Sequence, residues 1–477
     1  MPEPLNDRGR LTDVLRLVER EAEAYLGTID TALVRPPGGE HLESRLPSEG
    51  VGSLQAISEL IAASLEGATR STGPRYFHYV TGGVTPSALA ADWLASALDQ
   101  HAYNWVGSPF ASRLEQISLG WLKELFGLPA EWSGVLTTGG TASNFVGLAA
   151  ARRWWGLKHE VDIDTEGFAG LPPVPVFASG YLHASAVKAL GMLGIGRRQP
   201  QILSRDAGGR LDLEALAAAL DGLGGKPAIL IATAGDVNTG DFDPLVEMAD
   251  LAGAYGAWLH VDGAFGLFAA ASPLTQHLVK GIDRADSVAV DGHKWLNVPY
   301  ESGFAFVRDP VIHAGAFSAT AAYLRTEPSA RPVFGNLSAE MSRRARALPV
   351  WATLRAYGRD GYRAMVERHL GLAQRVARQV DDAPDLERLA DVPLNVVCFR
   401  FHPAGVAEEA LDSLNRKLGE SILEDGRVAF GTTEYAGKVA FRPAIVNWRT
   451  EDEDVDLIVQ VVRELGAKLA GSMAREG

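Results

Sequence analysis

Short apolar runs alternate with helix-like runs between residues 75 and 310, and this alternation limits the fold more than any other feature. The apolar runs read GVLTT, VPVFAS, AILIATA, AWLHVD, SVAVD and GFAFV, and amphipathic runs such as PLVEMADLAGAYG separate them. Continuous apolar strands between helices are typical of a mostly parallel sheet that is buried on both faces. We therefore predict an α/β fold whose ligands bind at the carboxyl ends of the strands.

The regions on either side of this alternation have other patterns. Residues 1–74 contain two amphipathic helical runs that are too thin for a core of their own, so we expect them to pack on a partner subunit or on the rest of the molecule. Residues 75–345 are predicted to form the large domain. In residues 346–477 a long helical run leads to NVVCFRFHP and KVAFRPAIV, which indicates a smaller α+β domain. A chain of 477 residues exceeds one comfortable core, which agrees with this division.

The composition excludes several classes of protein. The formal net charge of -14 argues against non-specific binding to nucleic acid, which requires clustered basic residues. The lone cysteine, Cys398, cannot form an internal disulfide, and we expect it to be buried on an apolar strand. No apolar signal segment follows the N-terminus, and no run of about 18 apolar residues is present. We therefore expect no membrane association, no cysteine-bound metal and a cytoplasmic location.

The segment GVLTTGGTASNFVGLAAAR has the pattern of a strand, a glycine-rich turn and a helix. Glycines before a helix allow backbone N–H groups to approach an anion, and the helix dipole favours negative charge there. The hydroxyls of Thr141 and Ser143 add donors. The segment lacks the G-K-[ST] ending of a Walker A loop, and a purely structural turn is an equal alternative.

Two charged residues stand at the ends of apolar strands. Asp262 follows WLHV, where a carboxylate is costly unless it caps a turn or meets a cation such as a protonated ring nitrogen. Lys294 lies in SVAVDGHKWLNVP, between apolar flanks. A lysine amine that is partly removed from water is a better nucleophile towards a carbonyl, although most lysines are surface residues. An anion-binding turn, an acid and an amine together match the three groups of pyridoxal phosphate that a protein contacts: the phosphate, the pyridinium nitrogen and the aldehyde.

The segments HVDGAFGLFA, DGHKWLNVP, TTGGTASNFVGLAAAR and YLHASAVKALGMLG resemble those of a known family. This family is the pyridoxal-phosphate-dependent group II amino-acid decarboxylases, of the aromatic-L-amino-acid decarboxylase kind, which have fold type I. The resemblance spans about residues 70–370. It implies pyridoxal 5'-phosphate as the cofactor, a small-molecule amino acid as the substrate, and a homodimer in which a neighbouring subunit completes each active site.

The resemblance also implies roles for individual residues. Lys294 is expected to form a Schiff base with the cofactor, Asp262 to pair with the pyridine nitrogen, and His183 to stack on the ring. The other implied contacts are with the phosphate (Gly140, Thr141 and Ser143), near the ring (Thr233 and Ala264) and beside the lysine and the phosphate (Asp291 and His293).

The product depends on a loop position that the sequence leaves open. Many members of the family carry a tyrosine there that returns a proton to the substrate. A count without gaps places Phe334 at this position, and the nearest tyrosine is Tyr323. Relatives with phenylalanine at this position yield an aldehyde, so decarboxylation to the amine is the prediction and aldehyde synthesis is the alternative. The composition of residues 326–336 fits a mobile lid in either case.

The substrate pocket is less well defined by the sequence. Aromatic amino acids are the first expectation and acidic ones the second. Candidates for side-chain recognition are His101, Tyr103 and Asn104, and Thr81-Gly82-Gly83 is expected to open space where relatives carry a more aromatic wall.

Other functions are compatible with the same residues for binding the cofactor. A carbon–carbon lyase and an aminotransferase would use the same lysine, acid and anion turn, and Arg442 is a candidate for the substrate carboxylate in an aminotransferase. A protein that binds or scaffolds on a degenerate fold, without catalysis, is the alternative from a different class.

Overall fold

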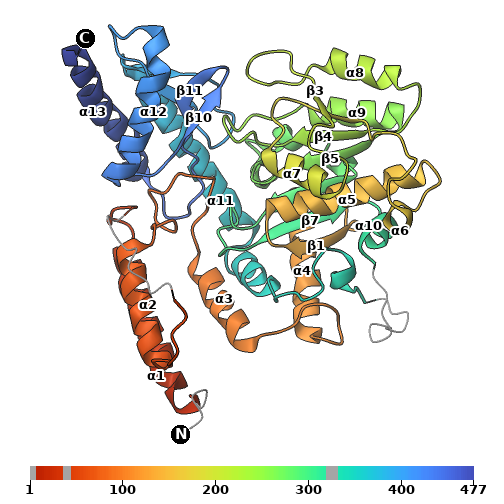
Figure 1. Cartoon of the computed structure of the whole chain (residues 1–477), viewed down its shortest axis with the longest axis horizontal. Helices are drawn as coiled ribbons and strands as arrows, with labels where there is room; N and C mark the ends of the chain where they lie inside the picture. The colour runs from red at the N-terminus through yellow and green to blue at the C-terminus, as the bar shows by residue number, and fades with distance from the viewer. Residues whose placement is uncertain (1–6, 36–44, 319–330, 477) are drawn as a thin grey trace.

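A computed structural model describes residues 7–35, 45–318 and 331–476 (Figure 1). Its large sheet has seven strands. In spatial order they are β1 (Ser133–Thr137), β7 (Gly303–Val307), β6 (Ser287–Asp291), β5 (Trp258–Asp262), β4 (Ile229–Thr233), β2 (Val176–Ala178) and β3 (Pro200–Ile202). The strands from β6 to β3 are parallel, whereas β7 is antiparallel to both β6 and β1. The predicted α/β fold with a mostly parallel sheet is confirmed.

Two details of this sheet differ from the sequence prediction. Strand β7 is antiparallel because only residues 292–302 separate it from β6, and a parallel neighbour would need a longer crossover. Strand β3 was not predicted, since its three residues, Pro-Gln-Ile, carry no apolar run. The other six strands coincide with the six predicted apolar runs.

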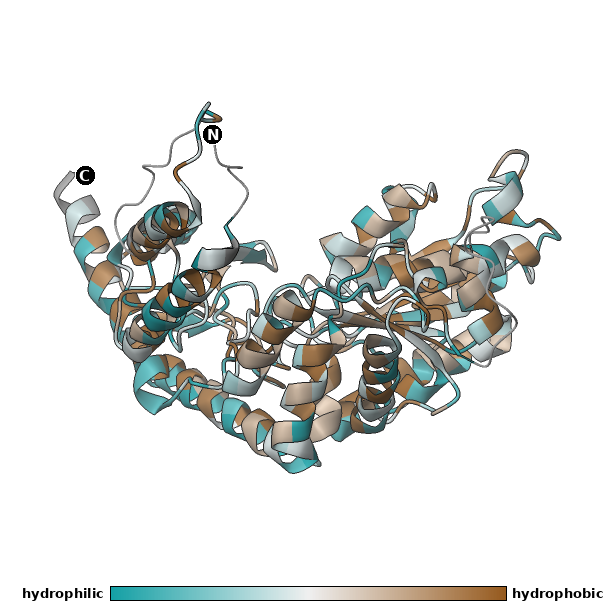
Figure 2. Ribbon diagram, turned by 90° about the horizontal axis from the view of Figure 1, so that it is seen from below, coloured by the Kyte–Doolittle hydropathy of each residue, from teal (hydrophilic) through white to brown (hydrophobic). Residues whose placement is uncertain are grey.

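Helices cover both faces of the sheet (Figure 1). The helices of this region are α3 (Pro86–Leu98), which packs on α11 (Ala347–Asp382), and α4 (Pro109–Phe126), α5 (Gly140–Leu157), α6 (Ile163–Glu166), α7 (Ala184–Met192), α8 (Leu213–Gly222), α9 (Leu245–Tyr255) and α10 (Pro310–Phe317). Short 3-10 helices are η1 (Arg8–Arg10), η2 (Gly266–Ala271), η3 (Gln276–Val279), η4 (Ile282–Arg284) and η6 (Phe334–Asn336). Figure 2 shows the strands of the large sheet as largely apolar, as burial on both faces requires.

The C-terminal region builds a second, antiparallel sheet. Its strands are β10 (Thr432–Tyr435), β11 (Lys438–Phe441), β9 (Phe399–Phe401) and β8 (Leu386–Arg388), and helices α12 (Glu408–Asp425) and α13 (Asp452–Glu476) pack with it. Cys398 is fully buried as expected, although it lies directly before β9 rather than on a strand, and burial raises the pKa of its thiol to about 12. The small C-terminal antiparallel sheet is the predicted α+β element.

Helix α11 (Ala347–Asp382) belongs to two hydrophobic cores. Its first half, through Val366, packs in the core beneath the large sheet, and from Leu372 onward it packs with the C-terminal sheet. The division into residues 1–74, 75–345 and 346–477 stays a prediction.

The N-terminal helices α1 (Leu11–Thr28) and α2 (Ser53–Gly67) lie beside one another and extend away from the large sheet (Figure 1). Leucines on both are exposed, among them Leu15 at 60% and Leu60 at 52%. Among the described residues, none of the helices has the length and apolar character needed to cross a membrane.

Candidate active site

A cavity of about 320 Å³ lies at the carboxyl ends of the parallel strands. Thr233 ends β4, Asp262 ends β5 and Asp291 ends β6, and all three side chains line this cavity. The remaining lining residues are Thr138, Gly139, Gly140, Thr141, Ala142, Tyr181, His183, Ser185, Gly235, Val237, Ala264, Phe265, His293, Lys294, Tyr300 and Glu301. The fold thus brings nine of the ten sequence-predicted site residues to one cavity.

One end of the cavity is the start of α5. The first intrahelical bond of α5 runs from Ser143 N–H to Gly139 O, so the N–H groups of Thr141 and Ala142 precede the helical ladder and can meet an anion. A Cβ on Gly140 would lie 2.6 Å from Asp291 Oδ2, so only glycine allows this approach. The Gly140 N–H donates to Asp291. This cradle fits a phosphate group.

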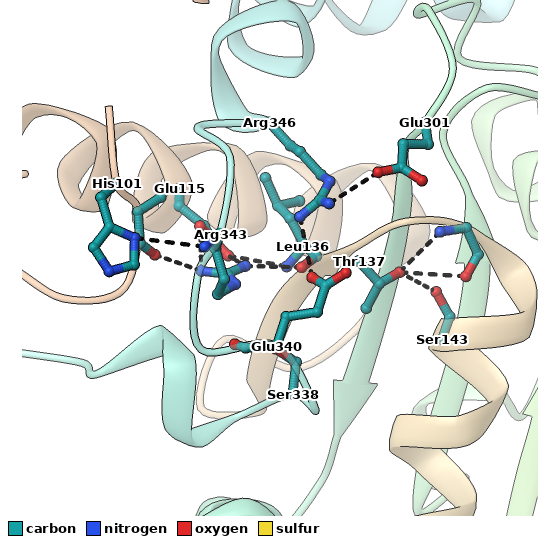
Figure 3. Close-up of polar contacts among 12 residues, drawn as sticks. His101, Glu115, Leu136, Thr137, Ser143, Glu301, Ser338, Glu340, Arg343 and Arg346 are labelled. Atoms are coloured by element: carbon teal, nitrogen blue, oxygen red, sulfur yellow. Dashed lines mark hydrogen bonds and ion pairs between the residues drawn. The ribbon is translucent and has the colours of Figure 1, made fainter. Parts of the chain in front are cut away.

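Ser143 is the one predicted phosphate residue that lies elsewhere. Its fully buried hydroxyl is 2.7 Å from Thr137 Oγ1 and 3.3 Å from Val290 O, and it is absent from the lining of the cavity (Figure 3). Thr138, which the sequence reasoning missed, lines the cavity instead. Its signal was a hydroxyl directly before the glycine pair.

The amine and two neighbours form a compact polar group. Lys294 Nζ lies 3.0 Å from Asp291 Oδ2, and His293 Nε2 lies 3.3 Å from Asp291 Oδ1. The Ser302 N–H donates to His293 Nδ1, and burial lowers the pKa of His293, so the neutral ring carries its proton on Nε2. The ring of Tyr300 stacks on His293 with centroids 4.1 Å apart. Lys294 is thus held at the cavity by Asp291.

Asp262 occupies another wall of the cavity. It is 4% exposed and accepts two hydrogen bonds, from Asn144 Nδ2 at 2.8 Å and from Ala264 N–H at 3.2 Å. Buried carboxylates of this kind are stable when a cation or further donors face them. Asp262 also lines the cavity, where a protonated ring nitrogen would be a further partner.

His183 stands at the N-terminus of α7. Its Nδ1 accepts hydrogen bonds from Ser185 N–H at 3.2 Å and from the Ser185 hydroxyl at 2.7 Å. Partial burial lowers the pKa of His183, which agrees with an unprotonated Nδ1. The neutral ring therefore carries its proton on Nε2.

The residues predicted for substrate recognition lie outside this cavity in the single chain. Tyr103 and Asn104 are largely buried, and His101 lies beside a separate surface hollow with Arg343. The glycine at 82 does not open space. A Cβ there would come within 1.9 Å of the Lys294 carbonyl oxygen, so Gly82 allows two backbones to approach closely.

The two candidates for the loop position have different outcomes. Phe334 is 2% exposed and packs in the core rather than lining the cavity. The Arg343 guanidinium carbon lies over the Phe334 ring, 5.5 Å from the ring centroid. Tyr323 lies outside the described residues, as do residues 326–330 of the predicted lid. Arg442, proposed for a substrate carboxylate, donates to Val237 O at 3.4 Å beside the cavity, and burial lowers its pKa.

Several cavity residues gave no signal in the sequence. Tyr181, Phe265, Val237, Tyr300 and Glu301 come from loops that only the strand order brings together. Glu301 is paired with Arg346 at 3.0 Å, and Arg346 also donates to Glu340 at 3.1 Å (Figure 3). The rim therefore carries two carboxylates against one guanidinium.

Comparison with known proteins gives a consistent result. The family model described as the pyridoxal-dependent decarboxylase conserved domain matches residues 41–402. An aromatic-L-amino-acid decarboxylase of Bacillus atrophaeus is 29% identical over 450 residues, covering 93% of this chain and 91% of that one. An L-2,4-diaminobutyrate decarboxylase of Rhizobium meliloti (strain 1021) is 33% identical over 436 residues, with 90% and 85% covered. The crystal structure of Oryza sativa TDC with PLP and tryptamine has a TM-score of 0.90 at 24% identity, covering 98% and 100%.

Proposed function

The chain belongs to the pyridoxal-dependent decarboxylase family and is a pyridoxal-phosphate-dependent amino-acid decarboxylase, and we propose that its substrate is an aromatic L-amino acid. The single observation that carries the assignment of residues is that Lys294, Asp262 and the start of α5 line one cavity. Pyridoxal phosphate, when bound, supplies an aldehyde for the lysine and a ring that accepts electrons from the breaking bond.

We assign the following work to the residues of the chain. Lys294 would condense with the aldehyde carbon of the bound cofactor with release of water, and Asp291 holds its amine at the cavity beforehand. Asp262 would keep a proton on the ring nitrogen. The backbone N–H groups of Thr141 and Ala142 would hold the phosphate. His183, the residue before α7, would offer its Nε2–H to the cofactor or the substrate.

The charges at the rim support a neutral substrate side chain. The carboxylate of Glu301 would repel an acidic side chain. A second ammonium group, as in diaminobutyrate, would have to compete with Arg346 for the same carboxylate, at 3.0 Å from it. Tyr300, Phe265 and Val237 offer aromatic and aliphatic surface in the same cavity. Aromatic amino acids therefore fit best, and diaminobutyrate is the next candidate because Glu301 is the acid that it would require.

A substrate screen with identified products tests this proposal. Purified enzyme with pyridoxal phosphate would be incubated with aromatic, acidic and diamino acids, and CO2, amine, aldehyde, peroxide and keto acid would be measured. We expect CO2 and amine in equal amounts from an aromatic substrate. Aldehyde with peroxide would identify an aldehyde synthase, whereas keto acid or carbon–carbon cleavage without CO2 would point to an aminotransferase or a lyase. Turnover of only diaminobutyrate would overturn the aromatic assignment.

We also propose that the enzyme works as a homodimer in the cytoplasm. The exposed leucines of α1 and α2, together with Trp93, Leu94 and Leu98 of α3 at 41–50% exposure, form apolar surface suited to a second copy. Light scattering should give twice the chain mass of 51.0 kDa. A monomer at micromolar concentration would contradict the dimer without affecting the assignment of the reaction.

A further inference from the structure

A chain of buried hydrogen bonds extends behind Asp262, away from the cavity. Asn144 of α5 donates to Asp262 Oδ2 at 2.8 Å, and Asn144 Oδ1 lies 2.8 Å from His260 Nε2. His260 Nδ1 in turn lies 2.8 Å from Ser287 Oγ, which is 3.0 Å from Trp258 Nε1. The side chains of Asn144, His260 and Ser287 are fully buried. The active-site roles described above do not include His260, Ser287 or Trp258.

The two ends of this series of hydrogen bonds determine which partner donates in each bond. The Trp258 indole can only donate, and an ionised Asp262 can only accept. Ser287 therefore accepts from Trp258 and gives its own proton to His260 Nδ1, since the alternative acceptor, Gly147 O, is farther away at 3.4 Å. With Nδ1 accepting, the neutral ring of His260 carries its proton on Nε2 and donates to Asn144 Oδ1. The Asn144 amide then donates one N–H to Asp262.

We propose that His260 is a positioning residue that holds the Asn144 amide in the orientation that presents N–H groups to Asp262. The inference rests on the proposed pairing of Asp262 with the ring nitrogen of pyridoxal phosphate. The opposite amide orientation would set Asn144 Oδ1 against Asp262 Oδ2, two acceptors 2.8 Å apart with no hydrogen between them. His260 thus holds in place the amide that donates to Asp262.

Two further observations show that the surrounding structure accommodates a neutral His260 ring. Gly147 lies inside α5, where glycine is less favourable than alanine. A Cβ there would lie 2.6 Å from His260 Cε1, so this glycine leaves room for the ring. Burial also lowers the pKa of His260 to about 4, which keeps the ring neutral, as the direction of the bonds requires.

The same amide reaches a second residue of the cavity. Asn144 Nδ2 is 3.0 Å from Ser185 Oγ, so Ser185 accepts from Asn144 and gives its proton to His183 Nδ1. The orientation of one amide therefore affects the hydrogen bonds of both Asp262 and Ser185. His260 acts on both through Asn144.

The experiment compares two cofactors in full-length apoenzyme: pyridoxal phosphate and its analogue in which C–H replaces the ring nitrogen. Both carry the same aldehyde and phosphate, so the ratio of their dissociation constants reports the pairing of Asp262 with the nitrogen. We expect His260→Phe to lose about tenfold of the wild-type preference, or about 1.4 kcal/mol. His260→Gln should keep most of the preference, because its amide N–H can reach the position of Nε2.

His313 provides a matched control. It is also fully buried and makes hydrogen bonds of 2.8 Å to Ser133 Oγ and to Leu337 O. His313→Phe should lower stability and leave the cofactor preference unchanged.

The outcomes separate the inference from the proposed function. A wild-type enzyme that binds both cofactors equally would overturn the pairing of Asp262 with the ring nitrogen. A wild-type preference that His260→Phe keeps in full would overturn the role of His260 alone. Should His260→Phe fail to fold, His260→Asn replaces it, because its shorter amide stops at the position of Nδ1. The same tenfold loss is expected, and an unchanged preference overturns the inference.

Discussion

Lys294 Nζ and Asp291 Oδ2 lie 3.0 Å apart at the end of β6, and this ion pair holds the amine at the cavity before the cofactor arrives. We predict that Lys294→Ala abolishes turnover, because no other amine lines the described cavity. The variant should still bind pyridoxal phosphate, through the phosphate cradle and Asp262. Mass spectrometry after borohydride reduction should show the cofactor attached to the wild-type chain and not to the variant. Full activity of Lys294→Ala would refute the assignment.

The Asp262 carboxylate should be needed for its charge rather than its size. Removing one partner of a buried charge pair costs about 3–5 kcal/mol, so Asp262→Ala is expected to lower kcat by a factor of about a hundred or more. Asp262→Glu keeps the charge and should lose less. Steady-state kinetics with saturating cofactor measures both variants. Equal and small losses would count against a role in holding the ring proton.

Gly82 should be intolerant of a single methyl group. A Cβ at this position would overlap the Lys294 carbonyl oxygen at 1.9 Å, so Gly82→Ala must displace the backbone that carries the lysine. We expect a loss of about 1–3 kcal/mol in stability and a weaker affinity for pyridoxal phosphate. Gly120→Ala in α4 is the matched control. It meets no atom within 4 Å, and should stabilise the helix by about 0.5–1 kcal/mol. Similar effects of the two substitutions would contradict the steric argument.

The sequence predicted the parts of this molecule that local pattern controls. Each apolar run forms a strand, because its continuous apolar residues suit burial on both faces of a parallel sheet. Asp262 and Lys294 could be picked out for a similar reason, since Asp262 ends one apolar strand and Lys294 follows another, whereas His183 was indicated only by the resemblance to the family. Ser143 could not be placed correctly, because which hydroxyl of TTGGTAS faces the cavity depends on the pitch of α5. Tyr300, Glu301 and the Asn144–His260 contact depend on strand order, which no local pattern encodes.

The buried carboxyl of Asp243 should make stability depend on pH. Burial raises its pKa from 3.8 to about 7, although the Thr233 N–H and the Ser179 hydroxyl donate to it. Between these values the folded state binds a proton that the unfolded state has lost, so this group lowers stability as pH rises through the interval. Asp243→Asn should therefore gain little at pH 4 and about 2–4 kcal/mol at pH 8, measured by urea unfolding. The exposed control Asp250→Asn should change stability by less than about 0.5 kcal/mol at either pH, and an equal gain for Asp243→Asn at both pH values would refute the explanation.

Breaking the buried ion pair between Arg343 and Glu115 by a single substitution should be costly for stability. Both side chains are 1% exposed, with Arg343 Nη2 2.7 Å from Glu115 Oε1, and Arg343 also donates to the carbonyls of Ala102 and Leu136 (Figure 3). Arg343→Met leaves the carboxylate buried without its cation and should cost about 3–5 kcal/mol.

A double-mutant cycle separates this coupling from loss of packing. Arg343→Met combined with Glu115→Leu should cost clearly less than the sum of the two single substitutions, because no unpaired charge stays in the core. The neighbouring Arg344 pairs with Asp92 at the surface, and Arg344→Met should cost about 0–1 kcal/mol. Strictly additive losses in the cycle would show that the two charges are not coupled.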